Sequence, residues 1–103
     1  MADLNNALAT AVKTGKVLFG AETTLKIAMS GKVSLIVIAA NCPKETRESL
    51  EYYCKLSEIP MIVYPGTSLE LGRICNRPFF VSVMAIRDPG SSEILKMAAE
   101  KNV

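Results

Sequence analysis

The sequence has no histidine and no tryptophan among its 103 residues. Without histidine there is no ordinary Ser–His or Cys–His catalytic pair. Lys–Ser or carboxylate-pair chemistry stays open, although no spacing in the chain indicates it. The three cysteines (Cys42, Cys54 and Cys75) are widely spaced and form no CxxC motif, so we expect neither a zinc site nor a disulfide framework. We therefore predict a noncatalytic protein without a cofactor or a metal.

Motifs for nucleotide phosphates and for membranes are also missing. Gly15-Lys16 and Gly31-Lys32 lack the other glycines and the Ser or Thr of a phosphate-binding loop. The longest apolar run, at residues 35–40, is far too short to span a bilayer, and the first residues contain no signal-peptide core. We expect a cytoplasmic protein that does not contact a membrane.

Charge is low and unevenly distributed. The net charge is +2, with balances of +2 for residues 1–41, −2 for 42–72 and +2 for 73–103. Basic ends around an acidic middle suit one nucleic-acid face and one solvent face, and chance explains the pattern equally well. Half of the residues are hydrophobic, enough for a core in a single domain over residues 1–103.

Hydrophobic periodicity predicts helices and strands in strict alternation. Asp3 is a candidate N-cap of the first helix, Thr67 and Glu70 have the spacing of a capping box, and the last helix starts at Ser91 or Ser92. The other expected helices and strands are helices 3–13, 22–30, 44–57 and 68–74 and strands 17–19, 34–40, 61–64 and 79–86. This order predicts an α/β fold, a three-layer α/β/α sandwich around a four-stranded sheet.

The second and third helices are expected to bury an apolar face each. Leu25, Ala28 and Met29 share one side of the helix at 22–30. In the helix at 44–57, the inward-facing residues are expected to be Leu50, Tyr53, Cys54 and Leu56. The outer face of this third helix alternates acids and bases, a pattern typical of a solvated surface.

The first candidate binding segment is the turn at Gly20, between a strand and a helix. Glycine allows a tight turn and close approach of a ligand, and the helix start exposes N–H groups that favour phosphate. Thr23 and Thr24 offer hydroxyl groups, and Lys26 lies about one turn along from Glu22. A plain capped helix start is the alternative interpretation.

Two further segments follow or precede strands. Asn41 can exchange hydrogen bonds with a base edge, or it caps the helix after Pro43. In the segment 77–81, Arg77 can contact phosphate, and Phe79 or Val81 can cover an unstacked base. If the strand starts at Phe79, adjacent side chains alternate and at least one of the two phenylalanines belongs to the core.

Three long stretches carry a family resemblance. They are TGKVLFGAETTLKIAMSGKVSLIVIAANCP, LEYYCKLSEIPMIVYPGTSLELGRICNRP and VSVMAIRDPGSSEIL, with EYY and GTSLELG specific to one branch. The chain resembles the L-thirty-e (L30e) family of archaeal and eukaryotic large-subunit ribosomal proteins, within the kink-turn RNA-binding superfamily. The resemblance implies a four-stranded mixed sheet and a protein that is monomeric when isolated. It also implies that the protein binds a kink-turn of ribosomal RNA, a sharply bent internal loop with tandem sheared G·A pairs. Other proteins of the large subunit are expected as further partners.

The resemblance also implies roles for individual residues. Gly20 allows close backbone approach, Asn41 bonds a base edge, and Phe79 and Val81 pack against an unstacked base. The position of Glu22 is often basic in this family, and an acid there repels phosphate but accepts hydrogen bonds from guanine N–H groups. Thr23 stands where other superfamily members carry a glutamate.

Three functions are consistent with these observations. The first is a structural constituent of the large ribosomal subunit. The second is a kink-turn RNA-binding subunit of a nonribosomal ribonucleoprotein, which would share the fold and the site. The third is a small enzyme or protein-interaction domain of similar layers, against which the missing histidine and phosphate motif count.

Overall fold

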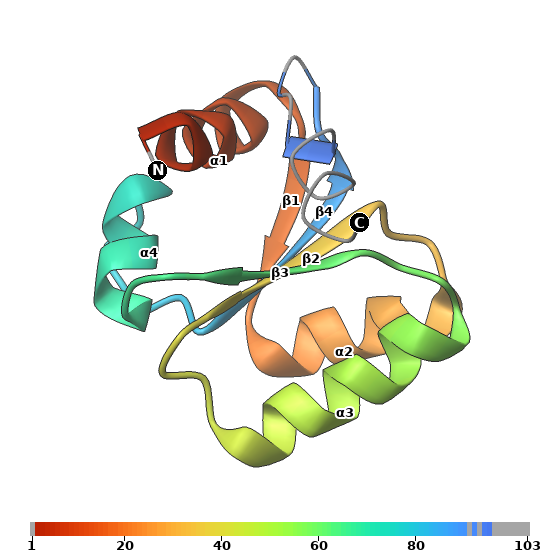
Figure 1. Cartoon of the computed structure of the whole chain (residues 1–103). Coiled ribbons are helices and arrows are strands. Elements are labelled where there is room, and N and C mark those ends of the chain that lie inside the picture. The colour runs from red at the N-terminus through yellow and green to blue at the C-terminus, as the bar shows by residue number, and fades with distance from the viewer. Residues whose placement is uncertain (1, 91, 93, 96–103) are drawn as a thin grey trace.

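The computed structural model describes residues 2–90, 92, 94 and 95. Within these residues helices and strands alternate from the first helix to the last strand (Figure 1). The elements are α1 Ala2–Thr14, β1 Lys16–Phe19, α2 Ala21–Ser30, β2 Leu35–Ala39, α3 Lys44–Leu56, β3 Met61–Tyr64, α4 Ser68–Ile74 and β4 Val83–Asp88. The last predicted helix, from Ser91 or Ser92, lies largely outside the described residues.

The four strands form one mixed sheet in the order β1-β4-β2-β3. β4 pairs antiparallel with both β1 and β2, and β2 pairs parallel with β3. Strands β1, β2 and β3 therefore point the same way, and β4 runs against them. The predicted four-stranded mixed sheet is confirmed.

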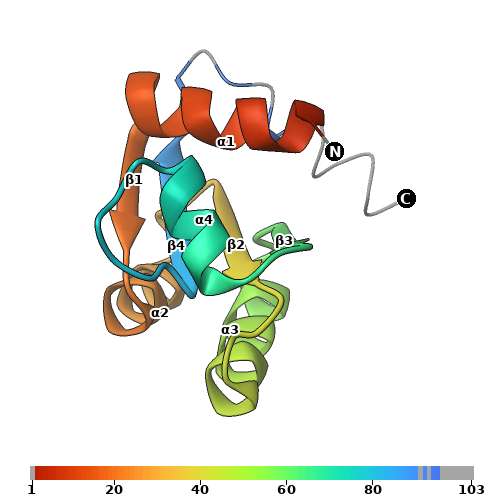
Figure 2. The same ribbon diagram turned by 90° about the vertical axis from the view of Figure 1, so that its left-hand side faces the viewer.

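Of the helices α1 to α4, two cover each face of the sheet (Figures 1 and 2). α1 and α4 pack on one face, and α2 and α3 pack on the other. β2 shows why both faces need cover. Leu35, Val37 and Ala39 join the α1–α4 core while Ile36 and Ile38 join the α2–α3 core, because successive side chains of a strand alternate. The expected three-layer sandwich is confirmed.

Several local predictions are confirmed and others are wrong. The capping box of α4 is present, because Glu70 N–H donates to Thr67 Oγ1 at 3.3 Å and Thr67 N–H donates to Glu70 Oε1 at 3.4 Å. α1 begins at Ala2, so Asp3 lies inside the helix and is not its N-cap. Met29 and Leu56, expected to face inward, are 57% and 68% exposed. Each is turned around its helix, by about 100° per residue, from the buried side marked by Ala28 on α2 and Cys54 on α3.

The buried and exposed leucines of α3 provide a matched test of this packing. Leu50 is fully buried, so Leu50→Ala removes core contacts and we expect a loss of about 2–5 kcal/mol in the free energy of unfolding. Leu56→Ala on the same helix should change it by less than about 0.5 kcal/mol. Urea denaturation followed by circular dichroism measures both values. Equal losses in the two variants would contradict the observed orientation of α3.

Candidate nucleic-acid interface

The strand directions bring the three candidate segments to one edge of the sheet. β1 and β2 end at this edge, and the antiparallel β4 begins there. Gly20 N–H donates to the Val83 carbonyl at 3.1 Å, and Ala39 N–H donates to the Ser82 carbonyl at 2.8 Å. The Gly20 turn, the Asn41 segment and the 77–81 segment therefore share one edge of the sheet.

Gly20 adopts a backbone conformation that other residues rarely accept. Its φ is 103° and its ψ is 144°, and a Cβ built there would have no atom within 4 Å. The requirement for glycine is thus conformational, and the space over the turn is open to a ligand. Asp, Asn, Ser and Thr, the usual N-cap residues, are absent from this position, and α2 has no side-chain cap. Gly20 is itself the N-cap residue of α2, and contact of this turn with RNA stays a prediction.

The first turn of α2 presents backbone donors next to an acidic side chain. Ala21, Glu22 and Thr23 are exposed, and Thr24 N–H is the first to bond back to the Gly20 carbonyl at 3.0 Å. Lys26 is exposed about one turn further on. Thr24 was expected to offer its hydroxyl at the surface, but it is fully buried, and its Oγ1 has no hydrogen-bond partner among the described residues.

Asn41 is held by the start of α4 rather than by α3. Its Oδ1 accepts from Ser68 N–H at 2.8 Å, and its Nδ2 donates to Ser68 Oγ at 3.5 Å. The alternative of a cap on α3 is wrong, because that helix has Pro43 at its N-cap and no side-chain cap bond. The carboxamide is exposed and oriented, and it keeps hydrogen-bonding capacity for a base edge.

Phe79 stands on an aromatic support that the sequence reasoning missed. Its ring packs edge-on against Phe19 with centroids 6.1 Å apart, and Arg77 places its guanidinium carbon 4.8 Å from the centre of the same Phe19 ring. Phe79 is 50% exposed and Arg77 is exposed. Phe19 is the last residue before Gly20, and this position at the strand end was the available signal.

The segment 77–81 is a loop, and the predicted strand start at Phe79 is wrong. β4 begins at Val83. Phe79 and Phe80 are 50% and 69% exposed, so the expectation that at least one of them belongs to the core is wrong. Val81 instead fills the α1–α4 core at 2% exposure, and its N–H donates to the Ser68 carbonyl at 3.0 Å. Its side chain supports the loop from below and does not reach the surface.

Contact with α4 explains why this segment leaves the sheet. Arg77 N–H donates to the Gly72 carbonyl at 2.9 Å, and Pro78 has no N–H for a strand ladder. A Cβ on Gly72 would clash with the Phe79 carbonyl oxygen. The loop therefore lies directly on the backbone of α4, which fixes the place of Phe79.

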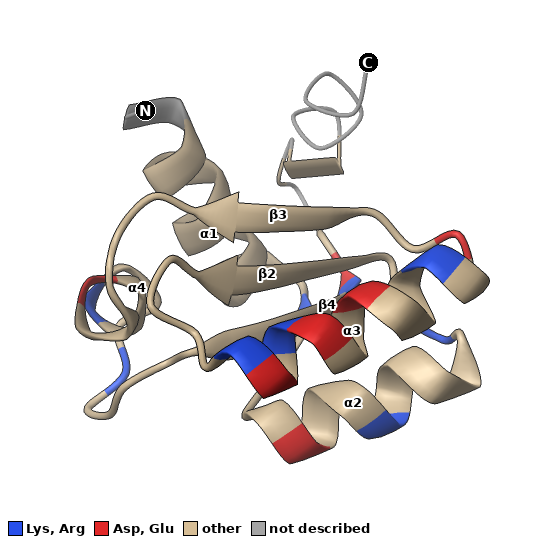
Figure 3. Cartoon of the chain, turned by 60° about the horizontal axis from the view of Figure 1, so that its bottom comes forward, with Lys and Arg blue, Asp and Glu red and all other residues tan. Residues whose placement is uncertain are grey.

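Charge is distributed unevenly around the edge. Arg73 and Arg77 line a cavity of about 500 Å³ together with Leu69, Pro78, Phe79 and Phe80. Along α3, acids and bases alternate, as predicted (Figure 3). Lys44 pairs with Glu48 at 3.7 Å and Arg47 with Glu51 at 2.9 Å. Among the described residues, Arg73 and Arg77 on the loop side and Lys26 on α2 form no ion pair.

The thiols are free, and two of them are buried. Burial raises the pKa of Cys54 and of Cys75 to about 11, and it raises the pKa of Cys42 against the opposing effect of Arg47. The fraction of thiolate at neutral pH is therefore small. Among the described residues, no group of His, Cys, Asp and Glu side chains could hold a metal ion, and no helix could cross a membrane.

A comparison with protein families identifies the relatives of this chain. A sequence model described as "Ribosomal protein L7Ae/L30e/S12e/Gadd45 family" matches residues 2–96. The chain belongs to this family. The resemblance to the L30e branch is confirmed by proteins named "Large ribosomal subunit protein eL30", to which the chain is similar over nearly its whole length.

Three archaeal members of this L7Ae/L30e family illustrate the similarity. The protein from Methanopyrus kandleri is 44% identical over 92% of this chain and 87% of its own length. The protein from Methanothermobacter thermautotrophicus is 45% identical over 92% of this chain and 97% of its own length. The protein from Methanocaldococcus jannaschii is 43% identical over 96% of this chain and 90% of its own length. A solved structure described as "The structure of a protein with unknown function from Bacillus halodurans C" has the same fold, with a TM-score of 0.81, 24% identity and coverage of 97% and 99%.

The contact between Gly72 and the Phe79 loop predicts the effect of a single methyl group. Alanine usually stabilises a helix by about 1 kcal/mol relative to glycine. Here the added Cβ meets the Phe79 carbonyl, so we expect Gly72→Ala to lower the free energy of unfolding by about 1–3 kcal/mol and to shift the NMR signals of Phe79 and Arg77. A more stable variant with unchanged Phe79 signals would contradict this contact.

Proposed function

We propose that this chain is a noncatalytic structural constituent of the large ribosomal subunit, located in the cytoplasm, and that it binds a kink-turn of ribosomal RNA. The observation that carries the proposal is the convergence of the Gly20 turn, Asn41 and Phe79 on one edge of the sheet. The eL30 names of relatives about 44% identical favour the ribosome over another ribonucleoprotein. The protein is a monomer when isolated and meets other large-subunit proteins in the particle.

The edge offers chemistry for a bent RNA with exposed bases. A regular A-form duplex hides its base edges in a deep groove, whereas a bend exposes them. Open space over Gly20 lets the RNA backbone approach the uncapped start of α2, where N–H groups favour phosphate oxygens. Asn41 then bonds a base edge, oriented by Ser68.

An unstacked base lies on Phe79 in this proposal. The ring is already fixed by Phe19, so little side-chain freedom is lost when a base stacks on it. Arg77, above the Phe19 ring, is positioned for the phosphate of the same nucleotide. Because the Val81 side chain is buried, we assign it to support of the loop and not to base contact.

Glu22 adds selectivity rather than attraction. An exposed carboxylate in the first turn of α2 repels a phosphate, but it accepts hydrogen bonds from the N–H groups of a guanine edge. Thr23 is exposed beside it with a hydroxyl group, and Lys26 supplies a nearby cation. This arrangement favours a purine edge in front of α2, with the phosphates displaced toward Lys26 and Arg77.

A gel-shift titration with a kink-turn RNA tests the proposal. Asn41→Ala removes a base-edge contact and Phe79→Ala removes a stacking surface, so each should weaken binding by about 1–3 kcal/mol. Leu56→Ala, at the far end of α3, is the control and should bind as the unchanged protein does. A second RNA, with Watson–Crick pairs in place of the sheared G·A pairs, should bind weakly to every variant.

Two results would count against this site. Normal affinity in both Asn41→Ala and Phe79→Ala would reject the edge as the contact surface. Equal affinity for the two RNAs would reject recognition of the bend. Because Asn41 also bonds Ser68, the unfolding free energy of each variant is measured alongside.

A further inference from the structure

The large apolar side chains exposed by the described residues fall mostly into two groups. One group surrounds the candidate interface and contains Leu69, Phe79 and Phe80. The other lies on α2 and α3 and contains Met29, Tyr52 and Leu56, which are 57%, 63% and 68% exposed. The proposed RNA contact explains the first group and gives no occupant for the second. Such exposure on neighbouring elements is typical of a docking surface.

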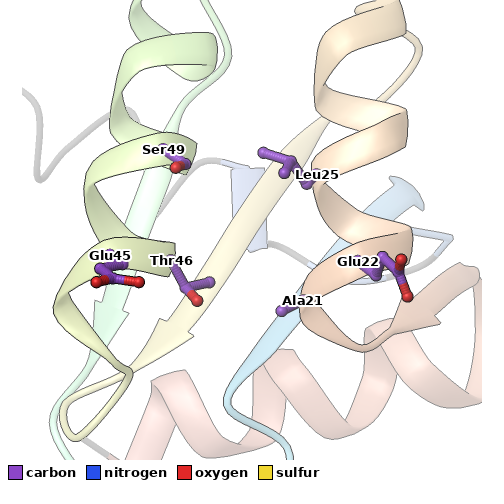
Figure 4. A pocket seen from close by; sticks show the side chains of 6 residues that line it. All are labelled: Ala21, Glu22, Leu25, Glu45, Thr46 and Ser49. Atoms are coloured by element: carbon purple, nitrogen blue, oxygen red, sulfur yellow. The ribbon is translucent and has the colours of Figure 1, made fainter.

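A groove between α2 and α3 leads from the sheet edge toward the second group. Its cavity of about 360 Å³ is lined by three residues of each helix. They are Ala21, Glu22, Leu25, Glu45, Thr46 and Ser49. Figure 4 shows that Leu25 and Ser49 point toward one another across the groove, while the two glutamates lie on the first turns of the two helices.

Helical periodicity extends this groove past the cavity. The two helices lie side by side and run in the same direction (Figures 1 and 4). Met29 lies one turn after Leu25 on α2, and Tyr52 and Leu56 lie one and two turns after Ser49 on α3. From Glu45 to Leu56 the groove is about 16 Å long at 1.5 Å per residue, enough for three turns of an added helix.

The charge of the groove selects the kind of occupant. Glu22 and Glu45 are the only charged side chains that line the cavity, and neither forms an ion pair within the described part of the chain. The other two glutamates of α3 each pair with a cation of their own helix. Unpaired carboxylates repel an RNA phosphate and attract a basic group. These charges favour a cationic protein segment over an RNA backbone in this groove.

We infer that the groove between α2 and α3 docks a basic amphipathic segment of another protein. Its cations lie against Glu45, and its apolar side chains cover Met29 and Leu56. Tyr52 serves as the aromatic anchor, because its ring already packs edge-on against the half-buried Tyr53 at 5.1 Å. This surface begins beside the RNA contact at the start of α2 and leads away from it along α3, so the protein joins an RNA and a neighbouring protein on adjoining surfaces.

Fluorescence anisotropy with two synthetic peptides tests the inference on the full chain. Both are labelled amphipathic helices of about 16 residues with the same leucines at helical spacing, one with lysines and the other with glutamates on its polar face. We expect the lysine peptide to bind about tenfold tighter. Tyr52→Ala should weaken it about fivefold or more, and Glu45→Gln about twofold to fivefold. Leu69→Ala, on α4, is the control and should leave binding unchanged.

Each of the following outcomes overturns the inference, and two of them identify a different occupant. Equal affinity for the two peptides, or no effect of Tyr52→Ala, rejects the docking surface. A dimer in sedimentation that Tyr52→Ala dissociates assigns the groove to a second copy of the chain. Loss of kink-turn RNA affinity in Tyr52→Ala assigns it to RNA. RNA binding that persists while the peptides fail refutes the groove alone and leaves the proposed function standing.

Discussion

The position of β4 between β1 and β2 is the constraint on which the rest of the structure depends. Among the described residues this strand is the last along the chain, yet it lies inside the sheet and runs antiparallel to both neighbours. Its first residues therefore meet the ends of β1 and β2. The bonds from Gly20 to Val83 and from Ala39 to Ser82 fix this meeting point. Without the antiparallel pairing, Phe79 and Gly20 would lie at opposite ends of the sheet.

A second set of contacts converts that edge into an ordered surface. Ser68, the first residue of α4, binds the Asn41 side chain with its N–H and the Val81 N–H with its carbonyl. Phe19 supports Phe79 and Arg77 at once. The polar and aromatic groups of the edge are thus positioned before any ligand arrives, which lowers the entropy cost of binding.

Much of the fold could be predicted from the sequence because its signals are local. Three of these signals depend on residues close in sequence. They are the change between helical and strand spacing of hydrophobic residues, the unbroken apolar run of β2 and the capping box at Thr67. The residue at which β4 begins could not be predicted in this way. Phe79 and Val81 have the composition of a strand, but bonding of the loop to α4 removes them from the sheet.

The candidate site was predictable residue by residue but not as an arrangement. Gly20 and Asn41 were predicted from residue type and from the family resemblance, and Arg77 was predicted from residue type alone. Their common edge follows from strand directions that no single segment encodes. Phe19 and Ser68 were missed because their roles exist only through contacts with residues distant in sequence. Thr24 was misplaced because helix orientation decides which of two adjacent threonines is buried.

The central claim is that the edge formed by Gly20, Asn41 and Phe79 holds large-subunit ribosomal RNA. Ultraviolet crosslinking of the protein in its native particles, with sequencing of the RNA and mass spectrometry of the peptide, tests it most directly. We expect the segment 77–81 and the start of α2 to crosslink to a kink-turn of the large-subunit RNA. Crosslinks confined to α1 or the outer face of α3, or only to nonribosomal RNA, would contradict it.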